Sequence, residues 1–560
     1  MKNFLKKLLA GAVLVTTALS SFACAGKKDP NAGKATLYVY SFTKGFGDEW
    51  LKSLIADYEA MHVNTEINGK KGIHIEPTAV GEDAGDIANR DEVIYFLEQQ
   101  DYYQLMASTR IADITDAVKG ENPYDAAGRT LEDKMFDDQK AYFGRTINGE
   151  TRYFAYPHYL TTFGIVYDVE LFDSMGYYFA DGYDPAGDLQ FKFLGSFGGK
   201  KTAGPDGEYN TSDDGLPTTY EEFLWLCDYI SGAHNPLLWT GQFRDSYLMH
   251  FINALATDYN GYEQTRLNYT FNGTATNLGT IVDGVFVEDA EDTVIDGENG
   301  AELARQAGKY YAMKFYEDLY KKTYINEKSD SLFGDKYDQY KAQEDFLIKA
   351  TKRNAMLLEG NWWNEEATPV FENTSVGKPE LSKQNRKLGW MPLPKANADM
   401  VDGSSTLYDI YYPLCVMKNG LDANSWEYKY AIDFIQFANS DAQLAKFTQI
   451  TGTTKALKYE LTPDQYKGLS CFGKSFYDHV QKSKIVFPYD NNLLFANNQK
   501  SFQSLDWGQG SPLYKSKVDG CQDVCVVSAI RKGTATAAQW FSGMHSYFVN
   551  HPSVQWKKSK

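Results

Sequence analysis

In three places along this chain of 560 residues, an aromatic ring stands beside amide, charged or further aromatic side chains. The three clusters are Trp239 with Gln242 and Arg244, Trp362 with Trp363, and Asp506 with Trp507. Rings flanked by such groups bind ligands that have apolar faces and hydroxyl edges, and a sugar ring is one of these. The alternatives are a lead-in to a helix for the first cluster, core packing for the paired tryptophans, and an aromatic surface loop for the last.

The paired tryptophans follow the apolar stretch 354–360, which ends in Gly360. Because successive side chains at the end of a strand face opposite ways, only one of the two rings can easily face a cleft. We take Trp363 as the first candidate for a ligand platform and Trp362 as the second.

An acidic, glycine-rich loop at residues 204–215 has a different chemistry. Its oxygen-bearing side chains are those of Asp206, Glu208, Asn210, Asp213 and Asp214. Calcium takes about six to eight oxygen ligands, so this spacing predicts a structural calcium ion that would pin the surrounding insertion. The loop is not an EF-hand, because Thr211 stands where that motif needs glycine and Pro217 where it needs glutamate. A solvated acidic turn is the alternative.

Several other motifs carry no function. Residues 468–475 spell the phosphate-binding pattern G-x4-G-K-[ST], but the polar residues before them cannot form the buried strand that such a loop needs. Cys521 and Cys525 lack the further cysteine or histidine pair of a zinc site, which leaves a local disulfide or free thiols. The sequence contains no H-E-x-x-H and no G-x-S-x-G, so we expect no catalytic residues and no cofactor for activity.

The elements that must position these residues begin with alternating strands and helices. Residues 35–40 and 73–77 read as strands, and residues 50–61 and 91–107 as the helices that follow them. This alternation implies a parallel α/β sheet, in which ligands bind at the carboxyl ends of the strands. Further helices are predicted at 301–322, 337–353 and 426–438, with a Gly- and Asp-rich insertion at 182–217 and a hairpin or loop at 271–300.

The composition restricts the partners. The formal net charge is −18, so we expect the chain to bind neither nucleic acid nor anionic lipid headgroups. Aromatic residues make up 15% of the chain, which fits a large core as well as aromatic binding surfaces.

The first 24 residues have the layout of a bacterial secretory leader. A basic start precedes the apolar run of residues 8–19, which is too short to span a bilayer. Ala23 before Cys24 resembles a lipobox, whose cysteine is lipidated at the new N-terminus; an ordinary A-x-A cleavage site is the alternative. We therefore predict a signal peptide at 1–23, a tether at 24–34, and an extracytoplasmic chain that reaches the cell membrane only through a lipid on its cysteine.

Four motifs occur in order between about residues 35 and 455. They are Tyr153–His158 with Gly164–Phe172 and Gly176, Pro217–Phe223, Asn354–Trp363, and Tyr430–Phe437 with Thr451 and Gly452. Together they resemble the extracellular solute-binding proteins of carbohydrate ABC importers, the maltose-binding-protein-like family. Asp168 stands where that family has asparagine, which keeps an acceptor and loses a donor. About the last hundred residues match the family poorly.

The resemblance implies an α/β, type II periplasmic-binding-protein-like fold, in which two lobes joined by crossing hinge segments close over a ligand. It places lobe 1 at 35–158 and 400–455, and lobe 2 at 159–399 and 456–560.

The resemblance also locates ligand contacts. It places them after the first strand, at Phe42 and Lys44, and it puts Tyr156 and His158 beside the hinge. The aromatic residue two positions after the glycine of its strand motif is Trp362. A solvated Lys44 and a structural His158 are the alternatives.

The function that the resemblance implies is capture without chemistry, in which a monomer binds a sugar, closes over it and docks on ABC permease subunits. The aromatic residues and the long insertions favour an oligosaccharide. One alternative is an exported glycoside hydrolase, which needs only a suitable carboxylate pair among the 74 acidic residues. The other is a surface glycan-binding adhesin without transport.

Overall fold

The computed structural model describes residues 31–43, 45–79, 87–98, 102–125, 128–241, 244–322, 324, 337–492, 494–495, 518, 520–523 and 525–550. Over these ranges, no helix combines the length and the apolar character needed to cross a membrane.

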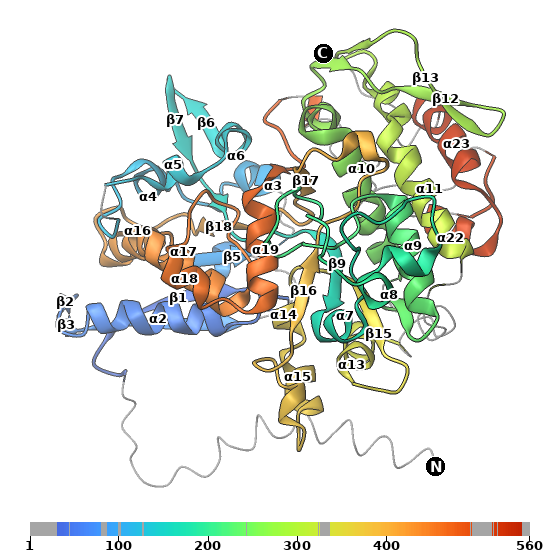
Figure 1. Ribbon diagram of the computed structural model, residues 1–560. Coiled ribbons are helices and arrows are strands. Elements are labelled where there is room, and N and C mark those ends of the chain that lie inside the picture. The colour runs from blue at the N-terminus through green and yellow to red at the C-terminus, as the bar shows by residue number, and fades with distance from the viewer. Residues whose placement is uncertain are drawn as a thin grey trace, which may run out of the picture.

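Two separate sheets form the framework of the molecule (Figure 1). The first sheet has the order β4 (Ile73–Ala79), β1 (Ala35–Ser41), β5 (Ile94–Leu97), β18 (Leu414–Met417) and β8 (Tyr156–Pro157). The second has the order β10 (Asn235–Leu238), β15 (Asn354–Gly360), β9 (Phe163–Asp168) and β16 (Leu388–Met391). In the first, β1 runs parallel to β4 and β5; in the second, β10 and β15 are parallel and β9 is antiparallel to both of its neighbours.

Helices cover the sheets. Around the first sheet lie α2 (Glu49–Met61), α3 (Tyr102–Ala107), α4 (Thr115–Lys119), α5 (Leu131–Lys134), α6 (Asp137–Phe143), α16 (Trp426–Ala438), α17 (Asp441–Thr451) and α18 (Pro463–Lys467). Around the second lie α7 (Val169–Met175), α8 (Leu194–Phe197), α9 (Tyr220–Ser231), α10 (Arg244–Thr270), α11 (Ala307–Lys321), α13 (Gln339–Leu347), α14 (Trp363–Glu366), α15 (Thr368–Thr374), α19 (Cys471–Gln481), α22 (Val526–Lys532) and α23 (Ala537–Asn550). Every residue of β9 and of β15 is buried, as expected for strands covered on both faces.

Shorter ladders complete the described fold. They pair β2 (Glu66–Ile67) with β3 (Lys70–Lys71), β6 (Gly144–Ile147) with β7 (Glu150–Tyr153), β11 (Gly273–Ala275) with β14 (Thr293–Ile295), β12 (Gly279–Val282) with β13 (Val285–Glu288), and β17 (Ser405–Tyr408) with β19 (Ser483–Val486). The hairpins of residues 273–295 confirm the prediction for that polar stretch.

The helix predicted at 91–107 is wrong over its first half. Residues 94–97 form β5, which lies in the middle of the first sheet, and of the residues described in this range only Tyr102–Ala107 is helical. The run Ile-Tyr-Phe-Leu is buried on both faces, so it lacks the alternation that distinguishes a strand from a helix. The helix predicted at 337–353 ends at Leu347, whereas the one predicted at 426–438 is confirmed as α16.

Three segments lie side by side where the chain passes between the two sheets. Residues 158–162 join β8 to β9, residues 409–413 join β17 to β18, and residues 452–457 follow α17. His158 N donates to Pro413 O at 2.8 Å and Ile410 N to Thr161 O at 2.8 Å, while Leu160 N donates to Thr454 O and Ala456 N to His158 O, both at 3.1 Å. The segment 158–162 is therefore hydrogen-bonded on both sides. We call the three segments the hinge, after the hinge segments that the resemblance predicts.

Asp168, the residue that departs from the family pattern, ends β9 and caps α7. Its Oδ1 accepts from Leu171 N at 3.1 Å, and its Oδ2 accepts from Arg386 at 3.1 Å and from Arg353. The side chains of Asp168 and Arg386 are both fully buried. An asparagine would keep the helix cap but would leave these two guanidinium groups without the carboxylate charge, which explains the aspartate.

We predict that Asp168→Ala lowers the free energy of unfolding by about 3–5 kcal/mol, because it leaves the buried Arg386 charge without this partner. Chemical denaturation of the variant measures the loss. Glu170→Ala is the matched control, since Glu170 also contacts Arg386 at 2.9 Å but is partly exposed. An equal, small loss in both variants would contradict the assignment of Asp168 as the main buried partner.

Candidate functional site

The loops that follow β1 and β15 meet at the carboxyl ends of the two sheets. A Cβ atom placed on Gly45 would lie 3.5 Å from Cβ of Trp362, and one placed on Gly47 would lie 4.0 Å from a carboxylate oxygen of Glu365. Ligands of open α/β sheets bind at this end of the strands. The candidate binding site is the place where these loops and the neighbouring segments meet. We call it the junction, and it is made of Gly45, Phe46, Tyr159, Trp362 and Tyr411.

Trp362 lies at the centre of an aromatic group within the junction. Its ring centroid is 5.3 Å from that of Tyr411, 6.2 Å from that of Tyr247 and 6.4 Å from that of Phe163. A Cβ atom on Gly360 would lie 2.2 Å from the indole, so the ring sits directly over this glycine. This close approach explains why the strand ends in glycine two residues before the tryptophan.

Trp363 has different surroundings. Its side chain has no exposed area, and its ring packs against Phe472 at 5.8 Å, Phe371 at 5.9 Å and Phe346 at 6.0 Å in the core beside the second sheet. The structure therefore places Trp362, and not the first candidate Trp363, at the junction. Trp239, at the end of β10, is also fully buried.

Tyrosines from the crossing segments contribute groups that the sequence analysis missed. The ring of Tyr159 lies 4.0 Å from that of Phe46, and its hydroxyl donates to Glu98 at 3.2 Å. The hydroxyl of Tyr411 lies 3.3 Å from Nε2 of His250, and burial lowers the pKa of this histidine to about 3. The imidazole is therefore neutral and can accept a hydrogen bond. The junction thus carries aromatic rings and tyrosine hydroxyls, with the Glu98 carboxylate hydrogen-bonded to one of them. These groups are the chemistry expected for a polyhydroxylated ligand.

Tyr156, in β8, and His158, at the start of the hinge, are both buried, with about 1% of each exposed. Nδ1 of His158 accepts from Nζ of Lys455 at 2.7 Å, and that ammonium group lies 4.6 Å from the ring centre of Trp50. Burial lowers the pKa of Lys455 to about 7 and also lowers the pKa of His158. His158 therefore joins two hinge segments to each other, whereas Tyr156 belongs to β8 and pairs with Cys415 of β18 in the first sheet.

Asp409 supports the hinge from its other side. Its Oδ1 accepts from Thr161 N at 3.1 Å and from Thr161 Oγ1 at 2.5 Å. Burial raises the pKa of Asp409 to about 7, although these two hydrogen bonds oppose the shift. The crossing segments are therefore tied by side chains as well as by backbone.

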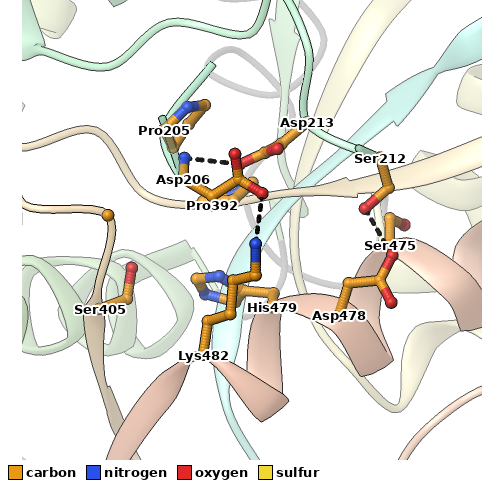
Figure 2. A pocket seen from close by; sticks show the side chains of 11 residues that line it. Pro205, Asp206, Ser212, Asp213, Pro392, Ser405, Ser475, Asp478, His479 and Lys482 are labelled. Carbon is orange, nitrogen blue, oxygen red and sulfur yellow. Dashed lines mark hydrogen bonds and ion pairs between the residues drawn. The ribbon is translucent and has the colours of Figure 1, made fainter. Parts of the chain in front are cut away.

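The acidic loop is held by hydrogen bonds and one lysine (Figure 2). Lys482, at the end of α19, contacts Asp206 and Glu208, each at 2.8 Å. Asp213 accepts from Asp206 N at 3.1 Å, and Asp214 accepts from Asn210 N at 2.9 Å. Burial raises the pKa of Asp213 to about 6.

The five predicted calcium ligands do not gather around one point in this arrangement. Among the residues that the structure describes, no group of three or more acidic, histidine or cysteine side chains could hold a metal ion. The ammonium group of Lys482 takes the position of a counter-ion for Asp206 and Glu208, so calcium would have to displace it. Calcium binding by the loop stays a prediction.

Several predicted site residues fall outside the description. Cys24, Lys44, Gln242, Asp506 and Trp507 lie outside the described residues, as does the side chain of Arg244. Phe42 is described and buried, and its N donates to Phe96 O at 3.1 Å.

Two of the motifs set aside on sequence grounds can be checked. The phosphate-loop spelling begins after a helix, α18, and not after a strand. Cys521 and Cys525 are both free thiols, so the local disulfide is not formed.

Comparison with known proteins reveals the fold. No family model and no curated protein sequence matches the chain. A chitin oligosaccharide binding protein is 13% identical over 90% of this chain and 97% of its own, with a TM-score of 0.48. BlMnBP1, a binding protein of an ABC transporter from Bifidobacterium animalis subsp. lactis ATCC27673 solved in complex with mannobiose, is 14% identical over 93% of this chain and 96% of its own, with a TM-score of 0.52.

The chain shares the fold of BlMnBP1. The likeness extends over nearly the whole of both chains, and it confirms the predicted α/β binding-protein fold. At this sequence identity it concerns the fold alone. The lobe boundaries stay predictions, although the first sheet draws its strands from residues 35–157 and 414–417 and the second from residues 163–391.

We predict that Trp363→Ala costs about 3–5 kcal/mol of unfolding free energy, as expected when a large aromatic side chain is removed from a packed core. Urea denaturation followed by circular dichroism gives the value. A loss below about 1 kcal/mol would contradict the core position assigned to this ring.

Proposed function

We propose that this chain is an extracytoplasmic binding protein that captures an oligosaccharide and delivers it to the permease of an ABC transporter. The observation that carries the proposal is the junction, where the Trp362 ring lies among three further aromatic rings at the carboxyl ends of the sheets. The fold supports it, because BlMnBP1 has the same fold and was solved with mannobiose.

Capture requires the two sheets to separate. Trp362 is only 5% exposed, and the loop after β1 lies against it. A sugar can therefore reach the indole only after the first-sheet side moves away from the second. The three hinge segments provide the axis, since their mutual hydrogen bonds are backbone contacts close to the rotation centre. No bond of the ligand is made or broken in this cycle, so we propose no enzyme activity.

The leader suggests how the protein is held near its permease. We propose that Cys24 carries the lipid and that residues 24–34 act as the tether, with the described domains acting as a monomer. Radiolabelled palmitate incorporated into wild type and not into Cys24→Ser supports the anchor. An unlabelled wild type that is secreted from the cell supports the ordinary cleavage site.

We predict that the mature chain is stabilised by oligosaccharides in a thermal-shift screen, with affinity rising from mono- to tri- or tetrasaccharide. A ligand at a thousand times its Kd stabilises a protein by roughly 4 kcal/mol, which is a large shift. Trp362→Ala should remove the response. The screen is run with calcium and again with chelator, which also tests the acidic loop. Equal affinity along the series, or wild-type affinity in Trp362→Ala, would contradict this assignment.

We also predict that a bound sugar lowers the radius of gyration of the mature chain in solution scattering. The reason is that ligand contacts from both sides of the junction favour the closed arrangement. The intact sugar should be recovered afterwards. An unchanged radius with saturating sugar would indicate a rigid adhesin, and a shortened sugar would indicate a hydrolase.

A further inference from the structure

The chain returns to the first-sheet side after β19, within the last hundred residues for which the family pattern gives no role. Residues 487–491 lie between α10, on the second-sheet side, and α6, on the first-sheet side. They begin beside the hinge, because the carbonyl group of Val486 accepts from Asp409 N at 3.0 Å. We call residues 487–491 the strap.

A buried arginine holds the strap on the second-sheet side. Nη1 of Arg266, on α10, donates to the carbonyl groups of Phe487 at 2.7 Å and Tyr489 at 2.8 Å. Nη2 of the same arginine donates to the carboxylate of Asp490 at 2.9 Å. The side chain of Arg266 is only 9% exposed. A guanidinium group that is bound at three points fixes the strap to α10.

Aromatic rings join the strap to the first-sheet side. The ring of Tyr489 stacks on that of Tyr142, in α6, with 3.9 Å between the ring centroids. The ring of Phe487 lies 5.5 Å from that of Phe136, directly before α6. Aromatic pairs of this kind contribute beyond the area that they bury. The strap therefore packs against one side of the molecule while it is hydrogen-bonded to the other.

The helices α6 and α10 also contact each other directly. The hydroxyl of Tyr262 donates to Oδ2 of Asp138, in α6, at 3.1 Å, and Nε of Arg266 lies 3.9 Å from the same oxygen. The side chain of Asp138 is only 7% exposed, so its charge depends on these partners. Tyr262 and Arg266 follow Gly261, where a φ of 72° divides α10 into two helical parts. The second part thus supplies both groups that face the α6 carboxylate.

We propose that the strap and the Asp138–Tyr262 contact hold the junction closed and set how often it opens to a ligand. This inference rests on the proposed function, since it concerns the opening that capture requires. The contacts join the two sides in the arrangement in which Trp362 is only 5% exposed. A state in which the two sides have separated loses the contacts between them, so each of these contacts favours the closed state.

The test measures opening by thiol labelling in the absence of sugar. Phe46→Cys places a thiol in the junction, where the native ring is 1% exposed. Cys227, which has no exposed area, reports global unfolding in the same molecule. The mature chain is treated with iodoacetamide at a low concentration, so that the rate at each thiol is proportional to the open fraction. Mass spectrometry of the digested chain gives the two rates.

We expect Tyr262→Phe in this background to raise the labelling rate at position 46 about tenfold, because it removes one hydrogen bond to a carboxylate. The rate at Cys227 should stay unchanged. Tyr489→Leu, which removes the stacked ring of the strap, should also raise the rate at position 46. The matched control is Tyr259→Phe, also on α10, since the ring of Tyr259 stacks on that of Tyr311 within the second-sheet side at 4.9 Å. It should label at the parental rate.

An unchanged rate at position 46 in either variant would overturn the proposal. A rise in Tyr262→Phe that Cys227 shares would also overturn it, because the contact would then stabilise the fold as a whole and not the closed state. The labelling needs no sugar, so its outcome is independent of the oligosaccharide screen. A junction that opens as expected in a chain that binds no oligosaccharide would contradict the proposed function and leave the strap in place.

Discussion

The hydrogen bonds on the two sides of segment 158–162 are the constraint on which the rest of the structure depends. A chain that passes from one sheet to another must satisfy its buried backbone groups on the way. Here the backbone N–H groups of His158 and Leu160 donate to segments 409–413 and 452–457. The carbonyl groups of Thr161 and His158 accept from the same two segments. Because the three segments satisfy one another, buried chain can join the two sheets, and the junction can lie beside these segments.

The hinge contains ionisable groups but no ion pair among its described residues. Lys455 donates to Nδ1 of His158 and lies over the ring of Trp50, and Asp409 accepts from Thr161. Burial moves the pKa of the lysine and of the aspartate to about 7 from opposite directions. A salt bridge across a hinge would resist rotation, since separating it leaves two buried charges. Hydrogen bonds to hydroxyl and imidazole groups avoid that cost, which is compatible with the rotation that the proposed function requires.

Much of the fold could be predicted from sequence, and the failures have physical causes. Thr219 caps α9 by accepting from Glu222 N at 3.2 Å, a local contact that a threonine directly before a helix favours. The strand at 94–97 was mistaken for helix because a fully buried strand has no polar alternation. The sequence predicts that one ring of the pair Trp362 and Trp363 faces a cleft, and it ranks Trp363 first. The structure places Trp362 at the junction, because the choice between the two rings depends on the loop at Gly45. Tyr159, Tyr247 and Tyr411 became part of the site only through the fold.

The acidic loop shows why a local pattern of charges is weak evidence for a metal. The contact between Lys482 and Asp206 joins residues 276 positions apart, so no window of sequence could contain it. A lysine that arrives from α19 gives the two nearest carboxylates a counter-charge, and backbone amides satisfy the other two. These contacts supply partners for all four carboxylates, so a calcium ion would have to displace some of them. The same reasoning applies to Trp362, whose environment is likewise assembled from distant elements. In both places the chemistry of a residue is set by the partner that the topology delivers, and this is why the junction is a stronger argument for function than any of the sequence clusters.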